Sequence, residues 1–483
     1  MKIKLISMVL AVVSTISFYG QSPAALTFKN DKFSRALTKS SLTLSNQSNN
    51  DLVILIVENK DLFAYLFNGD FSEKHYFQTN QIKKKYSTLL GYKVDGDVYH
   101  LLYSNTIKTK FAVFTVDFKS KKVNTKELEH KFYEDLYLET VTIKNIPYIL
   151  SADEKNNLTI STLDSSLEIA PIKTFELGQD KNIKLLRNLL ESSLFFRSYK
   201  GMDTMKSNIY KIDNRTPTPI EIASMPNKIY SINEKIYLTF EEVDSSTLVI
   251  EINLEKSSTN TFLIEYPKQE SESFEKFNSF LTDTALFQIA SSKEKMEVNV
   301  KDLQGNTLKN FKYSSIKEIE DKSSPYIISD PDLSLFHSQR ELKDSEKFLK
   351  KVSYGNNAIS CLTLGDIYHF TIGGSYRFKQ ANGGLAQTAF MGDYNEQAPI
   401  ISFNPTTTSF YSYNNTVSTY FNLSLDKNFE PIRLTSKSTI YENLLSHKKG
   451  IKYFTAENLF FHNNKLYYGK IDLKNREYSL NAL

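Results

Sequence analysis

The sequence predicts an all-β protein built from a repeated, four-stranded unit. Three observations predict it: a strand hairpin within Asp97–Glu127, variants of this hairpin along most of the chain, and an aspartate that recurs where the second strand ends. The hairpin joins a short aromatic and aliphatic run, Val98–Tyr103, to a second run, Phe111–Asp117, in which bulky residues alternate with small or polar ones. Such alternation is typical of strands in a larger sheet.

Eight copies of the hairpin can be followed in order along the chain. The first copy ends at Asn68-Gly69, a pair that adopts the positive φ angles of a tight turn. The eight copies are Leu52–Ile56 with Leu62–Phe67, Val98–Tyr103 with Phe111–Asp117, Pro147–Leu150 with Leu158–Asp164, Leu194–Phe196 with Ile209–Asp213, Ile236–Phe240 with Leu248–Asn253, Ala285–Ile289 with Met296–Asp302, Phe410–Tyr413 with Tyr420–Asp426, and Leu459–Phe461 with Leu466–Asp472. A ninth copy, Ile367–Thr371 with Tyr376–Phe378, lacks the terminal aspartate.

The recurring aspartates are predicted to be structural. Each follows the last buried aliphatic residue of a second strand, where an aspartate side chain accepts a hydrogen bond from the backbone two residues on and starts the turn. The residues in this position are Asp117, Asp164, Asp213, Asp426 and Asp472.

Each hairpin leaves room for two further strands. Around the Asp97–Glu127 hairpin these are Tyr86–Val94 and Val123–Leu128, which gives four strands in a unit of about 45 residues. One such sheet exposes both faces, so neighbouring units must stack. The pattern resembles the β-propeller superfamily. The resemblance implies one propeller domain over residues 21–483, with eight blades, or seven if the two chain ends share a blade. The chain has no tryptophan, so it departs from the WD40 and Asp-box repeats, and no specific family is matched.

The hairpin pattern is interrupted by an insertion that we place at about residues 325–405. Within it, Asp332–Val352 carries apolar residues that can share one side of a helix, and Ser338 with Glu341 has capping-box spacing. We therefore expect one or two short helices there, packed against the ring.

The second half of this insertion contains the candidate binding residues. Gly373-Gly374 and Gly383-Gly384 stand among aromatic residues and an arginine, a composition suited to a ligand or protein surface. The alternative is a hairpin tip that packs its aromatic side chains on a neighbouring blade. The candidate residues are Tyr368, His369, Tyr376, Arg377, Phe378, Phe390 and Tyr394.

The first twenty residues indicate export. Lys2 and Lys4 precede an apolar run, Leu5–Phe18, and Gly20 provides a small residue before Gln21. This order is typical of a signal peptide over residues 1–20; a membrane anchor is the alternative, but the run is shorter than the ~20 residues that span a bilayer. We expect a mature chain in the periplasm or outside the cell, without stable membrane insertion. Its one cysteine, Cys361, cannot form an internal disulfide and is expected to be buried.

Composition and motifs limit the functional classes. The net charge of +4 gives no electrostatic reason to expect nucleic-acid binding. The seven histidines have no paired spacing, and no catalytic or nucleotide-binding motif is present, so we expect no metal, no cofactor and no assignable catalytic residue. The first hypothesis is a monomeric binding protein that recognises a protein or glycan partner through interblade loops. The alternative is an extracellular hydrolase or lyase that acts on a glycan or peptide with carboxylates at the mouth of the propeller channel.

Overall fold

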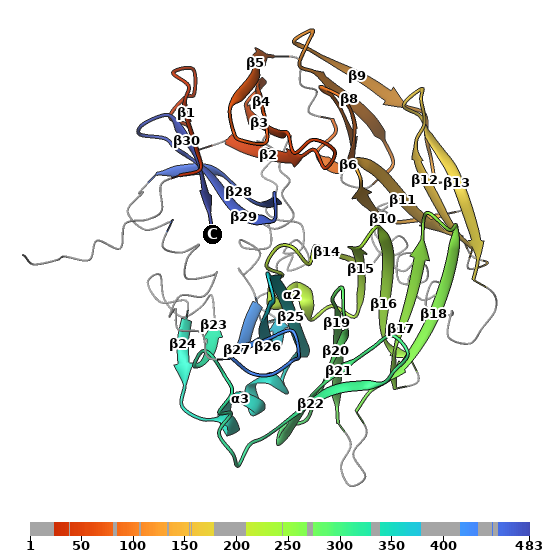
Figure 1. Cartoon of the computed structure of the whole chain (residues 1–483), viewed down its shortest axis with the longest axis vertical. Coiled ribbons are helices and arrows are strands. Elements are labelled where there is room, and N and C mark those ends of the chain that lie inside the picture. Colours follow the sequence, from red (N-terminus) through yellow and green to blue (C-terminus); the bar gives the residue numbers. More distant parts are fainter. Residues whose placement is uncertain are drawn as a thin grey trace, which may run out of the picture.

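In the computed structural model, the described residues of the chain form seven β-sheets arranged around a common centre (Figure 1). The structure describes residues 24–37, 39–80, 85–105, 108–132, 135–153, 155, 157–177, 209–243, 245–267, 274–329, 339–377, 416–432, 447 and 453–483. We number the sheets as blades 1 to 7 in chain order. In blades 1, 2, 3 and 5 the strands pair in the order of the sequence, and every pairing in them is antiparallel.

The first three blades have four strands each. Blade 1 contains β2 (Lys39–Ser45), β3 (Leu52–Glu58), β4 (Asp61–Phe67) and β5 (Glu73–Thr79). Blade 2 contains β6 (Thr88–Asp95), β7 (Val98–Ser104), β8 (Phe111–Asp117) and β9 (Lys122–Leu128). Blade 3 contains β10 (Leu136–Ile143), β11 (Ile146–Ala152), β12 (Asn157–Leu163) and β13 (Ile169–Glu176).

The next three blades include two with five strands. Blade 4 contains β14 (Tyr210–Ile212), β15 (Asn227–Ile232), β16 (Lys235–Val243), β17 (Ser246–Asn253) and β18 (Ser258–Glu265). Blade 5 contains β19 (Lys276–Leu281), β20 (Leu286–Ser291), β21 (Lys295–Lys301) and β22 (Thr307–Ser314). Blade 6 contains β23 (Tyr326–Ser329), β24 (Gln339–Leu342), β25 (Asn356–Leu364), β26 (Ile367–Arg377) and β27 (Thr416–Leu425).

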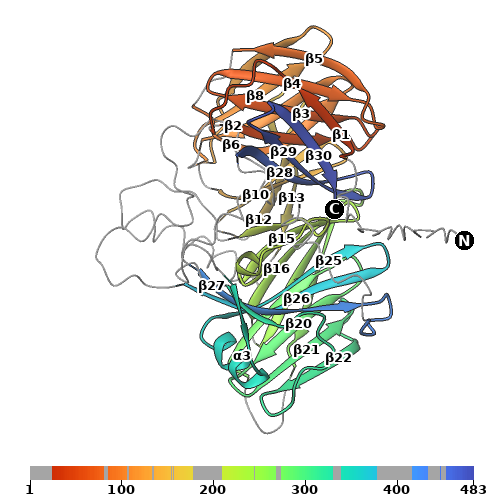
Figure 2. The same ribbon diagram turned by 90° about the vertical axis from the view of Figure 1, so that its left-hand side faces the viewer.

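Blade 7 is formed by both ends of the chain. Its strands are β28 (Phe454–His462), β29 (Lys465–Asp472), β30 (Glu477–Ala482) and β1 (Leu26–Lys29). The first described strand, β1, pairs antiparallel with the last, β30; the red and blue ribbons meet there in Figure 1 and lie side by side again in Figure 2. The described residues thus form a β-propeller with seven sheets, the smaller of the two predicted blade counts, and the chain ends share one blade as that count requires.

Six of the eight predicted hairpins are confirmed as adjacent, antiparallel strands. They are β3–β4, β7–β8, β11–β12, β16–β17, β20–β21 and β28–β29. The other two have first strands, 194–196 and 410–413, that lie outside the described residues. Their second strands are β14, which pairs parallel with β15, and β27, which pairs with β26 and β23.

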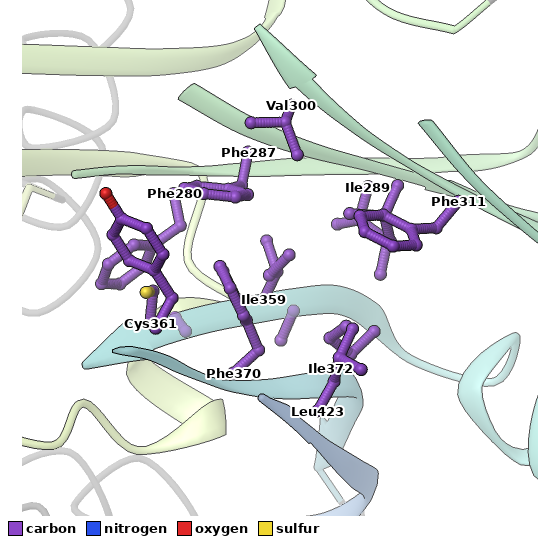
Figure 3. Packing of buried hydrophobic residues seen from close by; sticks show 14 of the residues in the cluster. Phe280, Phe287, Ile289, Val300, Phe311, Ile359, Cys361, Phe370, Ile372 and Leu423 are labelled. Atoms are coloured by element: carbon purple, nitrogen blue, oxygen red, sulfur yellow. The ribbon is translucent and has the colours of Figure 1, made fainter. Parts of the chain in front are cut away.

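The hydrophobic core lies between neighbouring blades. Strand β3 shows how one sequence supplies two interfaces, because every residue of Leu52–Glu58 is buried and successive side chains point to opposite faces. Val53, Leu55 and Val57 pack with blade 2, whereas Leu52, Ile54 and Ile56 pack with blade 7. The largest cluster joins blades 4, 5 and 6, and Figure 3 shows its side chains from blades 5 and 6 facing one another.

Buried polar groups also join blades 4, 5 and 6. The ammonium group of Lys228 in β15 donates hydrogen bonds to Asn278 Oδ1 (2.6 Å) and to the carbonyl of Ser279 (3.0 Å), both in β19. The Glu241 carboxylate lies 3.5 Å from the same ammonium, and both side chains are almost wholly buried. Asn278 donates in turn to the carbonyl of Asn357 in β25 (2.8 Å). The hydroxyl groups of Thr247, Tyr266 and Ser279 donate to Glu241.

The described part of the predicted insertion forms blade 6. Strand β26 continues through Gly373-Gly374, so the ninth hairpin predicted there does not form. A Cβ atom at Gly373 would lie 1.9 Å from the carbonyl oxygen of Thr419, and one at Gly374 would lie 2.9 Å from that of Asn356. These glycines therefore allow a close approach of strands rather than a turn.

The helix expected in this region is shorter than the sequence indicated. Helix α3 spans Ser345–Val352, the end of the predicted range, and buries the apolar residues Phe348, Leu349 and Val352. Its N-cap is Asp344, whose side chain accepts from the backbone N–H of Lys347. Glu341 lies on β24 instead, so the predicted capping box does not form.

Candidate functional site in the middle of the ring

The segment Tyr210–Ser224 lies inside the ring, where Figure 1 shows β14 and helix α2 (Ile220–Ala223) surrounded by the blades. Its local structure follows from its sequence. Asp213 ends β14 with a turn, because its carbonyl accepts from the N–H of Thr216 and its side chain from that of Arg215. Pro217 and Pro219 then provide no N–H for a sheet, and Pro219 precedes the single turn of α2.

This segment contacts five of the seven blades. Strand β14 pairs with β15 in blade 4, and Lys211 donates to the carbonyl of Thr140 in blade 3 (2.9 Å). Asn214 donates to the carbonyl of Leu281 in blade 5 (2.8 Å), and Glu221 accepts from Ser418 in blade 6. The guanidinium carbon of Arg215 lies 5.9 Å from the centre of the Phe461 ring in blade 7. Contacts on so many sides hold the polar side chains of the segment in place.

Arg215 and Asp213 form a bidentate ion pair, in which two guanidinium nitrogens donate hydrogen bonds to the two carboxylate oxygens. Arg215 Nε lies 2.8 Å from Asp213 Oδ1, and Nη2 lies 3.0 Å from Oδ2. The Asp213 carboxylate raises the pKa of Arg215 against the effect of burial. Burial opposes ionisation of Asp213, but the guanidinium nearby holds the pKa of that carboxyl below its ordinary value. Both groups are therefore charged at neutral pH.

These side chains remain accessible to solvent although blades surround them. The exposed fractions of the Arg215 and Asp213 side chains are 52% and 38%, and Lys211 is also exposed. Tyr92 of blade 2 is half-buried, and burial raises its pKa to about 12, with Arg215 and Asp213 acting on it in opposite senses. Phe461 is half-buried as well. We call Tyr92, Lys211, Asp213, Arg215 and Phe461 the ring-centre cluster.

Glu221 on α2 is buried, in contrast to the cluster. It is 5% exposed, and only one of its carboxylate oxygens, Oε1, has a hydrogen-bond donor among the described residues, the hydroxyl of Ser418. Burial raises the pKa of Glu221 from 4.5 to about 6 even though this hydrogen bond lowers it. Its burial against blade 6 indicates a role in docking α2 rather than in binding a ligand.

Replacing Glu221 by glutamine is expected to stabilise the protein at neutral pH. The folded-state pKa lies above the unfolded one, so the folded state binds more protons in this window and the wild type loses stability as pH rises from 4.5 to about 6. The loss should be about 2 kcal/mol in the free energy of unfolding. The measurement is denaturant unfolding of E221Q and the wild type at both ends of this pH range. The free energy of unfolding of E221Q should rise relative to that of the wild type by this amount as pH increases. The exposed Glu320 provides the control E320Q, and an equal gain there would contradict the assignment.

The five predicted turn aspartates all accept hydrogen bonds from the backbone two residues on. The N–H donors are those of Lys119, Ser166, Arg215, Asn428 and Lys474. This hydrogen bond in the turn explains why an aspartate is found at positions 117, 164, 426 and 472. Asp213 has a second role, because it also holds the guanidinium of Arg215.

The predicted binding residues are not brought together in the described part of the chain. Tyr368 is 6% exposed, and its hydroxyl hydrogen-bonds that of Thr284 (2.8 Å), so this residue packs in the core between blades 5 and 6. His369 is half-buried, and burial lowers its pKa. Tyr376 packs edge-on against Tyr354. Arg377 ends β26. Phe378, Phe390 and Tyr394 lie outside the described residues.

Sequence reasoning missed Lys211, Arg215, Tyr92 and Phe461. The available signal was the run Asp213–Pro219, in which two prolines and a basic residue interrupt a strand pattern. That run indicates a departure from regular sheet, but it does not say that the segment turns toward the middle of a ring.

Two further expectations concern metals and membranes. Within the described ranges, no group of three His, Cys, Asp or Glu side chains is placed to hold a metal ion. Neither helix of the described residues is long and apolar enough to cross a membrane. Cys361 is buried, and burial raises the pKa of its thiol.

Comparisons with known proteins give no family. No protein-family model matches the sequence, and no curated protein matches it. Among solved structures, an ACO/RPE65 chimera and cobalt-substituted Synechocystis ACO each match with a TM-score of 0.29 and 6% identity, over 57% of this chain and 61% of theirs. The structure of SapL1 lectin in complex with alpha methyl fucoside matches with a TM-score of 0.23 and 8% identity, over 70% of this chain and 89% of that chain. The chain thus matches about three fifths of the length of the two ACO structures. TM-scores this low carry no argument about function, and the fold is assigned from the sheet order of this chain.

Proposed function

We propose that the chain is an exported binding protein that recognises a protein or glycan partner. In this proposal the propeller is the scaffold and the ring-centre cluster, together with loops around it, is the recognition surface. The observation that carries the proposal is the placement of the Arg215–Asp213 ion pair and of Lys211, which are accessible to solvent and held by contacts with several blades. Groups held in this way lose little conformational entropy when a partner binds, which favours affinity.

Binding is favoured over the alternative of a hydrolase or lyase. Such enzymes commonly need one carboxyl group whose pKa is raised and which reaches the substrate, next to a second, ionised one. In the ring-centre cluster the pKa of Asp213 is lowered by Arg215, so this carboxyl is a poor proton donor. Glu221 has a raised pKa, but it is 5% exposed. The two groups therefore do not offer a substrate a matched acid and base.

Export is part of the proposal and is supported by residues 1–20. Lys2 and Lys4, the apolar run and Gly20 have the order of a cleaved signal peptide. The protein used for binding experiments should accordingly be the exported one, with Gln21 as its first residue.

The double variant K211A/R215A is expected to lose at least about nine tenths of partner capture. Removing two side chains that make hydrogen bonds should weaken binding by at least tenfold, because a hydrogen bond to a charged group such as Arg215 contributes about 1.5–3 kcal/mol. The measurement is quantitative capture from extracellular and envelope fractions on immobilised wild type and variant. The control is K317A, which removes a lysine whose side chain is 75% exposed on the turn after β22. Equal capture by K211A/R215A and the wild type would overturn the assigned surface.

A further inference from the structure

The chemistry of the ring-centre cluster narrows the class of ligand, provided that the proposed binding function holds. The first relevant property is charge. Arg215 and Asp213 form an ion pair whose charges cancel. Burial lowers the pKa of the neighbouring Lys211, and Asp213 opposes that effect. Glu139 of blade 3 also acts electrostatically on Lys211 and is half-buried. The central Arg215–Asp213 pair therefore has no net charge with which to attract an ion.

The second property is the mixture of donors and acceptors. Among the described residues, Arg215 uses Nε and Nη2 on Asp213 and has Nη1 left for another acceptor, and the Lys211 side chain donates to the carbonyl of Thr140. The Asp213 carboxylate provides acceptor oxygens at the same place. A sugar hydroxyl both donates and accepts, and it can use such a pair of groups at once, whereas a carboxylate or phosphate could use only the donors.

The third property is the apolar surface beside these polar groups. The Phe461 ring is half-buried and lies next to the Arg215 guanidinium. An aromatic ring offers a flat apolar surface to the C–H groups of a pyranose, and it gains hydrophobic contact when water is displaced.

We infer that the ring-centre cluster binds an uncharged saccharide, with Phe461 against its C–H groups and Arg215 and Asp213 on its hydroxyls. The ligand class follows from balanced charge, adjacent donors and acceptors, and one aromatic surface. These properties come from two elements: the turn after β14 carries Asp213 and Arg215, and β28 of blade 7 carries Phe461.

The test uses the full mature chain against an array of uncharged oligosaccharides, with the same sugars carrying carboxylate or sulfate groups. Hits are then measured by titration calorimetry. We expect uncharged sugars to bind, with affinity that changes little between about 0.05 and 0.5 M salt, because no net charge drives the association. F461A, R215A and D213N should each weaken binding by about tenfold or more, the loss expected when a contact of this strength is removed. Y354A, which removes an exposed tyrosine of blade 6, should bind as the wild type does.

Three results would overturn the inference. Binding that is confined to acidic sugars, weakens steeply with salt and strengthens in D213N would assign an anionic ligand instead. Uncharged sugars bound equally by F461A, R215A and the wild type would place the saccharide site elsewhere. Capture of a protein partner that depends on Lys211 and Arg215, with no sugar bound, would remove the ligand class and leave the proposed binding function standing. If neither a sugar nor a protein depends on the cluster, both proposals fail together.

Discussion

Replacing Lys228 by methionine is expected to lower the free energy of unfolding by about 3–5 kcal/mol. Burial lowers the pKa of Lys228, and the Glu241 carboxylate opposes that effect through its charge and a hydrogen bond. Methionine leaves the Glu241 carboxylate buried without its counter-ion and leaves Asn278 Oδ1 without the Lys228 donor. Chemical denaturation of K228M and the wild type, followed by circular dichroism, measures the difference.

The double variant K228M/E241Q separates the cost of the unpaired charge from that of lost packing. A glutamine at this position removes the negative charge and keeps an oxygen for Ser279, Thr247 or Tyr266. The double variant should therefore be more stable than K228M alone, although it carries one more substitution. If K228M lowers the free energy of unfolding by less than about 1 kcal/mol, the value of a surface pair, then the network that joins blades 4 and 5 does not need the Lys228–Glu241 ion pair within blade 4.

The hairpins could be predicted because their signal is local. In Leu52–Glu58 and Val98–Ser104 the apolar run, the turn residue and the next apolar run stand within about 20 residues, which is the range over which a strand pair is encoded. The turn aspartates belong to the same class of signal, since each acts on a backbone group two residues away.

Blade 6 shows where local reasoning fails. Gly373-Gly374 has the composition of a turn, but the reason for a glycine at 373 is the backbone of Thr419, which lies 46 positions along the chain and packs against it. Tyr368 similarly has the composition of a binding residue, and its partner Thr284 comes from blade 5. A single sequence does not state which distant strand will face such a residue, so packing and binding cannot be told apart from composition.

The contacts of the ring-centre cluster join residues that are even farther apart in the sequence. Arg215 meets Phe461 across the ring, and Lys211 meets Thr140. These contacts exist only after the blades have closed around the segment. Asp213 was predicted for its local turn, and its bond to Arg215 is equally local, but the access of both groups to solvent within the ring is a property of the closed fold.

Deleting Gln21–Lys29, which removes β1, is expected to lower the free energy of unfolding by about 3–6 kcal/mol, the value of burying one leucine and one phenylalanine. Leu26 and Phe28 lie opposite Leu480 and Tyr478 in blade 7. The Phe28 ring also stacks 5.0 Å from that of Tyr478 and lies 4.3 Å from that of Tyr65 in blade 1. The strand therefore completes one blade and packs on the next, which is how the chain ends hold the ring closed.

The blades in which hydrogen-exchange protection falls show whether β1 closes the ring or contributes to the core as a whole. Hydrogen exchange should become faster in β30 and β4, which contact β1 directly, while β20 in blade 5 keeps the protection of the wild type. F28A, which removes one ring and keeps the backbone pairing of β1 with β30, should show a smaller loss of stability in the same two blades. If exchange instead rises equally in all blades, β1 contributes to the whole core and the seven sheets unfold as one unit. If neither stability nor exchange changes, the pairing of the chain ends does not hold the ring together, and closure must come from the contacts that β2 makes with β28 and from the segment Tyr210–Ser224.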